Sequence, residues 1–167
     1  MRTDQIRQGR LSGERSGDLE HFLASMDADR WIAEVDLLVD MAHLLGLSRQ
    51  GIIEEAPARA LMAALLDLHD HGLPKEAFDE RFEDIHAGKE AYLIDRVGED
   101  VGGRLHMGRS RNDEVATCVR MRLKEEIIAL VRSLVDLRQT LLSVAAAHTK
   151  TVMPGFTHLQ HAQPTTL

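Results

Sequence analysis

Large aliphatic residues recur along the last third of the chain at spacings that alternate between four and three. The aliphatic series starts at Leu123 and Ile127 and runs without a miss to Val144, and His148 takes the next position in the same spacing. A period of 3.5 residues is the pattern of a coiled-coil seam and predicts one helix over most of residues 113–149. About 35 residues at 1.5 Å each make a rod on the order of 50 Å long. A domain this small cannot cover such a rod, so the seam requires partner helices from further sequence or from other subunits.

Weaker helical patterns precede the seam. Residues 1–17 carry three glycines among charges and are expected to form a loosely ordered arm. Apolar residues spaced by three and four then extend from Leu19 to Leu45, which predicts helix, and Gly46 suits its C-terminal end. Ser48 is a plausible N-cap for the helix that follows.

The remaining segments complete an all-α prediction. Pro57 fits the first turn of a helix that Gly72 ends, and a shorter helix is expected over residues 84–97. Residues 98–112 contain four glycines and predict a loop. Residues 156–167 predict a polar loop and the first turn of another helix. No segment shows the strict alternation of a strand.

The expected organisation is a small N-terminal helical domain, residues 1–112, followed by the first long helix of a central helical bundle, residues 113–167. Aromatic residues make up only 4% of the chain. Aliphatic side chains therefore supply the apolar content, which suits packed helices better than an aromatic-rich sandwich.

Charge and composition exclude several classes of protein. The formal net charge of −7 lacks the basic surplus of a nucleic-acid binder. Cys118 is the single cysteine, which excludes an intramolecular disulfide and favours a reducing compartment. The N-terminal residues resemble no signal peptide, and no apolar run approaches the ~20 residues of a membrane span. The sequence predicts a cytoplasmic protein that binds neither membrane nor nucleic acid.

The segment Gly108–Asp113 is a candidate anion site. Arg109 and Arg111 offer forked donors that suit carboxylates, while Ser110 and Asn112 add neutral hydrogen bonds. The segment leads into the N-terminus of the long helix, which also favours anions. It predicts a site for a small ligand with several carboxylates. An equally weighted alternative is a capping loop, in which Asn112 or the aspartate after it caps the helix and the arginines make surface ion pairs.

A second polar segment, residues 153–164, contains Thr157, His158 and His161. Histidine is the side chain most readily poised for proton transfer near neutral pH, so His158 is a candidate catalytic group. On composition alone, a polar surface loop with an idle histidine is the favoured interpretation.

Two groups nearer the N-terminus give weaker signals. Asp84 and His86 fit a helix N-cap better than a site. Metal binding is rejected, because His86 has no second histidine one turn away and no thiolate cluster. Ser25 and Asp29 are one turn apart and would share a helix face, although a break between two helices is the simpler interpretation.

Taken together, these segments resemble the argininosuccinate lyases. Residues 103–117, GRLHMGRSRNDEVAT, closely resemble the first signature of that family, and residues 154–164, PGFTHLQHAQP, resemble the second. Residues 83–86, EDIH, match its preceding acidic motif, and residues 24–36 match its N-terminal helix. The matches come in the family's order and spacing, and they cover the chain from about residue 25 onward.

The chain also departs from the family pattern. Met107 stands where the family often has a hydroxyl residue, Glu114 where it often has glutamine, and His161 where many members have arginine. The family's third signature, a mobile loop that carries the catalytic serine, does not occur in this sequence. The resemblance therefore implies the front portion of such an enzyme, inactive by itself.

The resemblance implies a carbon–nitrogen (amidine) lyase of the fumarase and aspartase superfamily, which cleaves argininosuccinate reversibly into arginine and fumarate during arginine biosynthesis. It implies a homotetramer whose active sites each draw on three subunits, and it implies neither a metal nor an organic cofactor. His158 would take part in proton transfer. The residues expected to bind substrate are Ser25, Asp84, Ser110, Arg111, Asn112 and Thr157.

Two other functions stay open from the sequence. One is a lyase of the same superfamily that acts on a different fumarate adduct. The other is a structural or binding protein on the same fold without catalysis, which the presence of both Asn112 and His158 disfavours.

Overall fold

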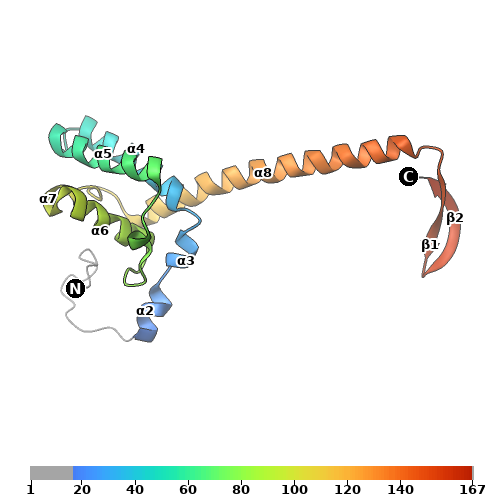
Figure 1. The fold of residues 1–167 in the computed structure, drawn as a ribbon, viewed down its shortest axis with the longest axis horizontal. Coiled ribbons are helices and arrows are strands. Elements are labelled where there is room, and N and C mark those ends of the chain that lie inside the picture. The colour runs from blue at the N-terminus through green and yellow to red at the C-terminus, as the bar shows by residue number, and fades with distance from the viewer. Residues whose placement is uncertain (1–16, 167) are drawn as a thin grey trace. The chain divides into compact units, whose positions relative to one another are not determined.

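The computed structural model describes residues 17–166, and the arm expected at residues 1–17 lies almost wholly outside them. The described chain is mostly helical (Figure 1), which confirms the all-α fold class. It divides into two compact units, Met1–Arg122 and Leu123–Leu167. Between residues 17 and 166 no helix is both long and apolar enough to cross a membrane.

Short and medium helices form the described part of the first unit. In chain order they are α2 (Gly17–Leu23), α3 (Met26–Asp29), α4 (Ala33–Arg49), α5 (Glu55–His71), the 3₁₀ helix η1 (Lys75–Phe78), α6 (Ile85–Val97), α7 (Glu99–Gly102) and the first turns of α8 (Arg111–Ala147).

An aliphatic core lies between α4, α5 and α6. Leu61 and Leu65 of α5 and Leu93 of α6 are fully buried, and Leu44 of α4 packs with them. Leu105, from the segment between α7 and α8, belongs to the same cluster and anchors that segment to the core. Helical spacing of the apolar residues in α5 explains why this helix presents one face to its neighbours.

Helix α4 ends later than the sequence predicted. Gly46 and Ser48 lie inside it, so both predicted boundaries are wrong. Gly51 follows the helix end with a φ of 67°. Its N–H donates to the Ser48 carbonyl and the Ile52 N–H to the Leu47 carbonyl, both at 3.0 Å, as in a Schellman motif. The helix continues this far because Leu47 is buried in the core.

Other predicted boundaries are confirmed. Pro57 lies in the first turn of α5, and Gly72 ends that helix with a φ of 86°. Gly98 ends α6 with a φ of 88°. The loop predicted over residues 98–112 is wrong in part, because the short helix α7 directly follows Gly98.

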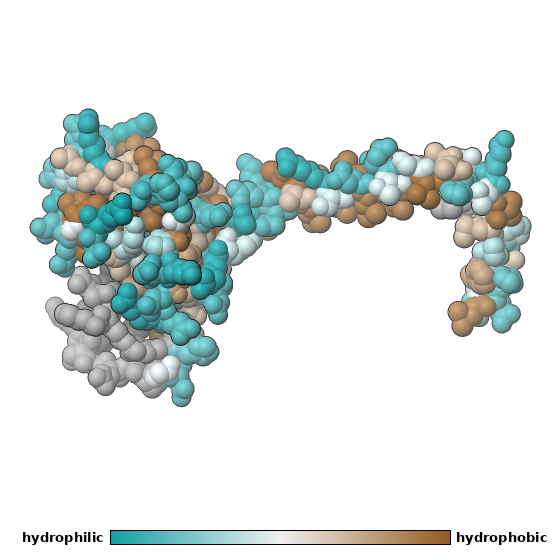
Figure 2. All heavy atoms as spheres, viewed as in Figure 1, coloured by the Kyte–Doolittle hydropathy of each residue, from teal (hydrophilic) through white to brown (hydrophobic). Residues whose placement is uncertain are grey.

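The second unit contains most of α8 and a two-stranded sheet. Helix α8 runs unbroken from Arg111 to Ala147, which confirms the long helix predicted from the seam. The seam residues form an exposed apolar stripe along it (Figure 2). The exposed fraction is 55–60% for Leu130, Leu134, Leu137 and Leu141. The surface that was predicted to pack against partner helices is therefore exposed.

An antiparallel hairpin follows α8, where the sequence predicted a polar loop and a helical turn. Strand β1 (Val152–Thr157) pairs with β2 (Gln160–Thr166), and the register is irregular between Pro154 and Phe156. Nearly all of the hairpin is exposed, so its strands bury no face and leave no alternating pattern. The helical prediction for this segment is therefore wrong.

Candidate functional site

Ser25 lies in the break between α2 and α3, as the simpler interpretation of this segment had it. Its hydroxyl donates to the Asp29 carboxylate at 2.8 Å. The same carboxylate oxygen accepts from the backbone N–H of Ile85 at 3.3 Å, and the Ser25 N–H donates to the Glu83 carbonyl at 2.8 Å. These bonds tie the Ser25 segment to the start of α6.

Asp84 connects α6 to α8. One carboxylate oxygen accepts from the Ala87 N–H at 2.8 Å, which confirms Asp84 as the N-cap of α6. The other forms an ion pair with Nη1 of Arg111. The Nη2 atom of Arg111 is buried and has no hydrogen-bond partner among the described residues. Asp84 is thus a cap and an ion-pair partner at once.

Ser110 caps α8. Its Oγ accepts from the Asn112 N–H at 3.2 Å, and Asp113 Oδ1 accepts from the Ser110 N–H at 2.9 Å. The arrangement resembles a capping box, except that Ser110 Oγ accepts from the second N–H of the helix and not from the third. Asp113 therefore takes part in the cap. The alternative interpretation, which made Asn112 or Asp113 the N-cap residue itself, is wrong on this point. The Asn112 side chain is exposed and makes no hydrogen bond within the described residues, so its carboxamide is available to a ligand.

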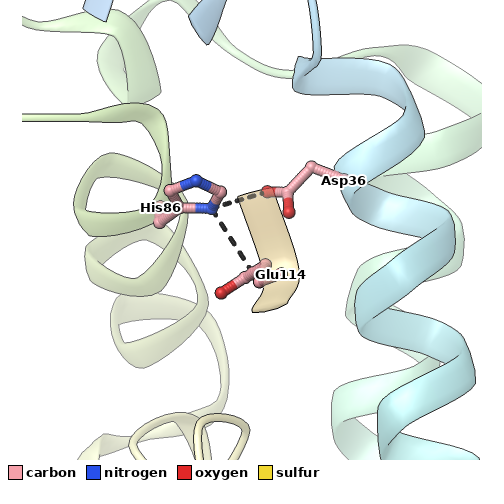
Figure 3. Close-up of side chains that lie close together, drawn as sticks. All are labelled: Asp36, His86 and Glu114. Atoms are coloured by element: carbon pink, nitrogen blue, oxygen red, sulfur yellow. Dashed lines mark hydrogen bonds and ion pairs between the residues drawn. The ribbon is translucent and has the colours of Figure 1, made fainter. Parts of the chain in front are cut away.

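A buried ionic cluster supports these residues, and sequence reasoning missed it. Helix α4 contributes Asp36 and Asp40, one turn apart and 0% exposed. Helix α6 contributes His86 and Lys89, with Lys89 Nζ in contact with both aspartates. Glu114, 1% exposed, comes from α8. Figure 3 shows His86 between Asp36 and Glu114, with Nδ1 at 3.1 Å and 3.4 Å from the two carboxylates.

The loop before α8 adds two basic side chains to this cluster. Nη2 of Arg109 contacts Asp40 and lies 2.8 Å from Glu114. The Nε atom of Arg109 donates to Nδ1 of His106 at 3.3 Å. On the outer side, His43 Nε2 lies 2.9 Å from the Met107 carbonyl oxygen. Asp40 and His43, both from α4, thus hold the loop against this helix.

The two histidines carry different charges. Burial alone would lower the pKa of His86, but its hydrogen bonds to Asp36 and Glu114 outweigh burial and raise the pKa to about 9. Burial and the neighbouring Arg109 guanidinium lower the pKa of His106 to about 4. At neutral pH, His86 is therefore a cation and His106 is neutral.

The acidic groups and the lysine respond to the same surroundings. Burial raises the pKa of Glu114, and the hydrogen bond with His86 and the attraction of Lys89 only partly offset it. Burial would lower the pKa of Lys89 and raise that of Asp36, but their mutual attraction dominates and keeps both charged. Burial raises the pKa of the Cys118 thiol to about 12, so this cysteine is no thiolate nucleophile.

Three side chains of the cluster have the spacing of a metal site. Ligand-type atoms of Asp36, His86 and Glu114 lie within 4.8 Å of one another. The Lys89 ammonium, however, contacts Asp36 and lies 3.9 Å from Glu114. A cation that belongs to the chain already balances these carboxylates. That no metal binds at His86 stays a prediction from the sequence.

Thr157 and His158 belong to the second unit, at the tip of the hairpin. Thr157 pairs with Gln160, and His158 and Leu159 form the two-residue turn between them. Their φ angles are 48° and 64°, the left-handed values of a type I′ turn, which normally favours asparagine and glycine. Both side chains are exposed, Leu159 by 95%. Strained backbone of this kind gathers at functional sites.

The predicted site residues therefore fall into two groups. Hydrogen bonds and ion pairs connect the segments around Ser25, Asp84 and Arg111, and Ser110 and Asn112 directly adjoin the last of these. Thr157 and His158 form a separate group on the hairpin.

The sequence profile of a lyase family matches residues 9–167. The chain belongs to this lyase family. Among its relatives, the argininosuccinate lyase of Methanoculleus marisnigri is 90% identical over all 167 residues. That of Methanosphaerula palustris is 62% identical over 98% of the chain. The chain spans 34% and 33% of these two proteins, or about a third of the curated relatives it matches.

Solved structures of lyases share the fold. An EDDS lyase variant with bound fumarate matches 98% of the chain and 33% of its own, at 27% identity and a TM-score of 0.70. EDDS lyase in complex with formate matches equally well, at 26% identity. The resemblance inferred from the sequence motifs is confirmed by these relatives.

Proposed function

We propose that this chain is part of an argininosuccinate lyase, which cleaves argininosuccinate reversibly into arginine and fumarate. The first turn of α8 carries the proposal. There, Arg111 is held at Nη1 by Asp84 and has its Nη2 unsatisfied, and the next residue, Asn112, has an exposed carboxamide. These donors suit a carboxylate. The names of the close relatives support argininosuccinate as the substrate.

The chemistry requires a group that moves a proton and donors that stabilise charge. A base removes a proton from the carbon beside a carboxylate, which gives a dianionic intermediate before the C–N bond breaks. Fixed cationic and N–H donors stabilise developing negative charge best. We assign this role to Arg111, Asn112 and Ser110, with Ser25 and Thr157 binding other parts of the substrate. His158 takes part in proton transfer, and Asp84 orients Arg111.

A homotetramer in the cytoplasm is part of the proposal. The exposed stripe of α8 supports it, because seven aliphatic side chains from Leu123 to Val144 are at least 42% exposed. Burying each contributes roughly 1.5–3 kcal/mol, so copies of α8 should associate. The 167-residue chain should sediment as an oligomer, and Leu134→Lys should shift it toward monomer. A well-folded monomer of the unsubstituted chain would refute this part.

A complementation experiment tests the proposed function. The test protein is a hybrid in which this chain replaces the matching third of the Methanoculleus marisnigri enzyme, to which it is 90% identical. Asn112→Ala and His158→Asn are each introduced into the hybrid. If different subunits supply the two residues to one site, each variant is nearly inactive, and subunits mixed by unfolding and refolding recover fumarate release. Two fully active single variants would refute the assigned roles.

A second candidate is elimination of fumarate from another adduct. The structural match to an EDDS lyase with bound fumarate favours it, because the match covers 98% of this chain. The hybrid should be assayed with both argininosuccinate and EDDS. Turnover of EDDS alone would favour this candidate.

A further inference from the structure

Glu114 is a buried carboxylate with three basic neighbours. It is the fourth residue of α8 and is 1% exposed. Its Oε1 atom lies 2.8 Å from Arg109 Nη2, 3.4 Å from His86 Nδ1 and 3.9 Å from Lys89 Nζ. A buried carboxylate is retained only where cations or donors compensate its lost hydration. The pairing of Glu114 is therefore a condition for this packing.

Arg109 connects the buried ionic cluster to the candidate site. Its guanidinium contacts Glu114 and Asp40 and donates to His106. Its backbone directly precedes Ser110, the residue that caps α8. Because the Arg109 side chain is only 4% exposed, it fixes where the chain enters the turn that carries Asn112.

The charges in this cluster balance. The titratable and charged groups that face one another are Asp36 and Asp40 from α4, His86 and Lys89 from α6, His106 and Arg109 from the loop, and Glu114 and Cys118 from α8. Cys118 and His106 are neutral at pH 7. Three carboxylates therefore face three cations, and removing one charge leaves a buried charge uncompensated.

We propose that Glu114 and Lys89 are positioning residues: a matched pair of buried charges that holds Arg109, and through it the turn Ser110–Asn112, in place. The role of that turn rests on the proposed function, whereas the charge pairing does not. The pair also accounts for a departure from the family pattern. A glutamine at position 114 would leave one surplus positive charge unless Lys89 were neutral as well.

A double-mutant cycle tests the pair. Glu114→Gln keeps the shape but leaves a surplus cation, and Lys89→Met leaves a surplus carboxylate. Each should lower the Tm of the 167-residue chain by about 5 °C or more. The double variant, Lys89→Met with Glu114→Gln, retains two carboxylates and two cations. It should recover more than half of the lost Tm. Glu76→Gln, at an exposed glutamate of η1, is the matched control and should leave Tm unchanged.

Kinetics of the hybrid enzyme test the positioning role. Glu114→Gln should lower kcat/KM for argininosuccinate by about 10- to 100-fold, because misplacement of a binding group by about 1 Å can cost that much. The loss should lie mainly in KM, since Glu114 is not assigned to proton transfer. The double variant should restore kcat/KM together with Tm, which a purely structural role at a distance from the site would not require.

Each outcome decides one part of the inference. A double variant no more stable than Glu114→Gln overturns the charge pair, whether or not the hybrid cleaves argininosuccinate. Recovered Tm without recovered kcat/KM overturns the positioning role. If Glu114→Gln fails to fold, a folded double variant still supports the pair, and failure of both overturns it. An inactive parent hybrid contradicts the proposed function, while the Tm cycle still decides the pair.

Discussion

Arg111 forms an ion pair with Asp84, so the first residue of α8 is joined to the N-cap of α6. The guanidinium uses Nη1 for this contact, and its buried Nη2 has no partner among the described residues. Buried donors are normally satisfied, and an unsatisfied one calls for an explanation. The carboxylate of the proposed substrate would supply one here.

Substitution of Arg111 should therefore do more than break the ion pair. In the hybrid enzyme, Arg111→Ala should raise KM for argininosuccinate by about 10- to 100-fold, as expected for a lost charge-assisted hydrogen bond. Asp84→Asn also breaks the ion pair but keeps a good N-cap, so its loss should be smaller. Equal losses in Arg111→Ala and Asp84→Asn would mean that Arg111 only holds α8 to α6 and does not bind substrate. Unchanged kinetics in both Arg111→Ala and Asn112→Ala would favour the capping-loop interpretation.

His158→Asn should abolish most turnover and leave the hairpin intact. Loss of a proton-transfer group typically costs about 10²–10⁴ in rate. Asparagine tolerates the positive φ of this turn better than most residues, so the hairpin should keep its conformation. Leu159→Gly is the control for backbone strain, since it relaxes the same turn without touching the imidazole. Fumarate release near the parent rate in His158→Asn would make His158 a bystander.

The two buried histidines should shape the stability of the chain against pH in opposite ways. The pKa of His86 is raised to about 9, so its contribution is complete below about pH 6.5 and is lost as the pH rises towards 9. The pKa of His106 is lowered to about 4, so its contribution is complete above about pH 6.5 and is lost as the pH falls towards 4.

Thermal unfolding followed by circular dichroism should accordingly show the highest Tm near pH 6.5. His86→Gln should flatten the alkaline side of the curve and His106→Gln the acid side. If the Tm of His86→Gln falls at alkaline pH as much as the Tm of the parent does, a group other than His86 causes that fall.

Two glycines should respond oppositely to alanine. A Cβ at Gly88 of α6 would overlap the carbonyl oxygen of Ala77 in η1, so Gly88→Ala should destabilise the first unit by several kcal/mol. Gly46 lies inside α4 with open space around its Cα. Gly46→Ala should therefore stabilise the chain by about 0.5–1 kcal/mol. Chemical denaturation measures both, and a stable Gly88→Ala variant would contradict the close packing of α6 against η1.

The helices followed from the sequence because apolar periodicity determines which face of a helix is buried. The seam from Leu123 predicted α8, and Gly72 and Gly98 marked two helix ends. The helix end predicted at Gly46 was wrong, because the burial of Leu47 extends α4 past this glycine, which the helix tolerates. Local signals of helix ends thus yield to tertiary packing at this position.

The ionic cluster could not be predicted, although traces of it are present in the sequence. Asp36 and Asp40 are one turn apart on the buried side of α4, and His86 and Lys89 are three residues apart on α6. Charged residues with such spacing usually lie on solvated faces. Only the packing of α4 against α6 and α8 shows that these charges are buried and balanced.

The hairpin escaped prediction for a different reason. Neither strand buries a face, and the turn at His158 and Leu159 lacks the asparagine–glycine pair that usually marks a type I′ turn. The motif that contains His158 did indicate chemistry, but its residues carry no pattern that indicates strands.

We propose that this chain supplies argininosuccinate-binding residues of a lyase. The most direct test is fumarate release from argininosuccinate by the hybrid with the Methanoculleus marisnigri enzyme, followed by ultraviolet absorbance. We expect a kcat/KM within about tenfold of that enzyme, a difference of no more than about 1.4 kcal/mol in transition-state stabilisation. A folded hybrid that releases no fumarate from argininosuccinate would contradict it.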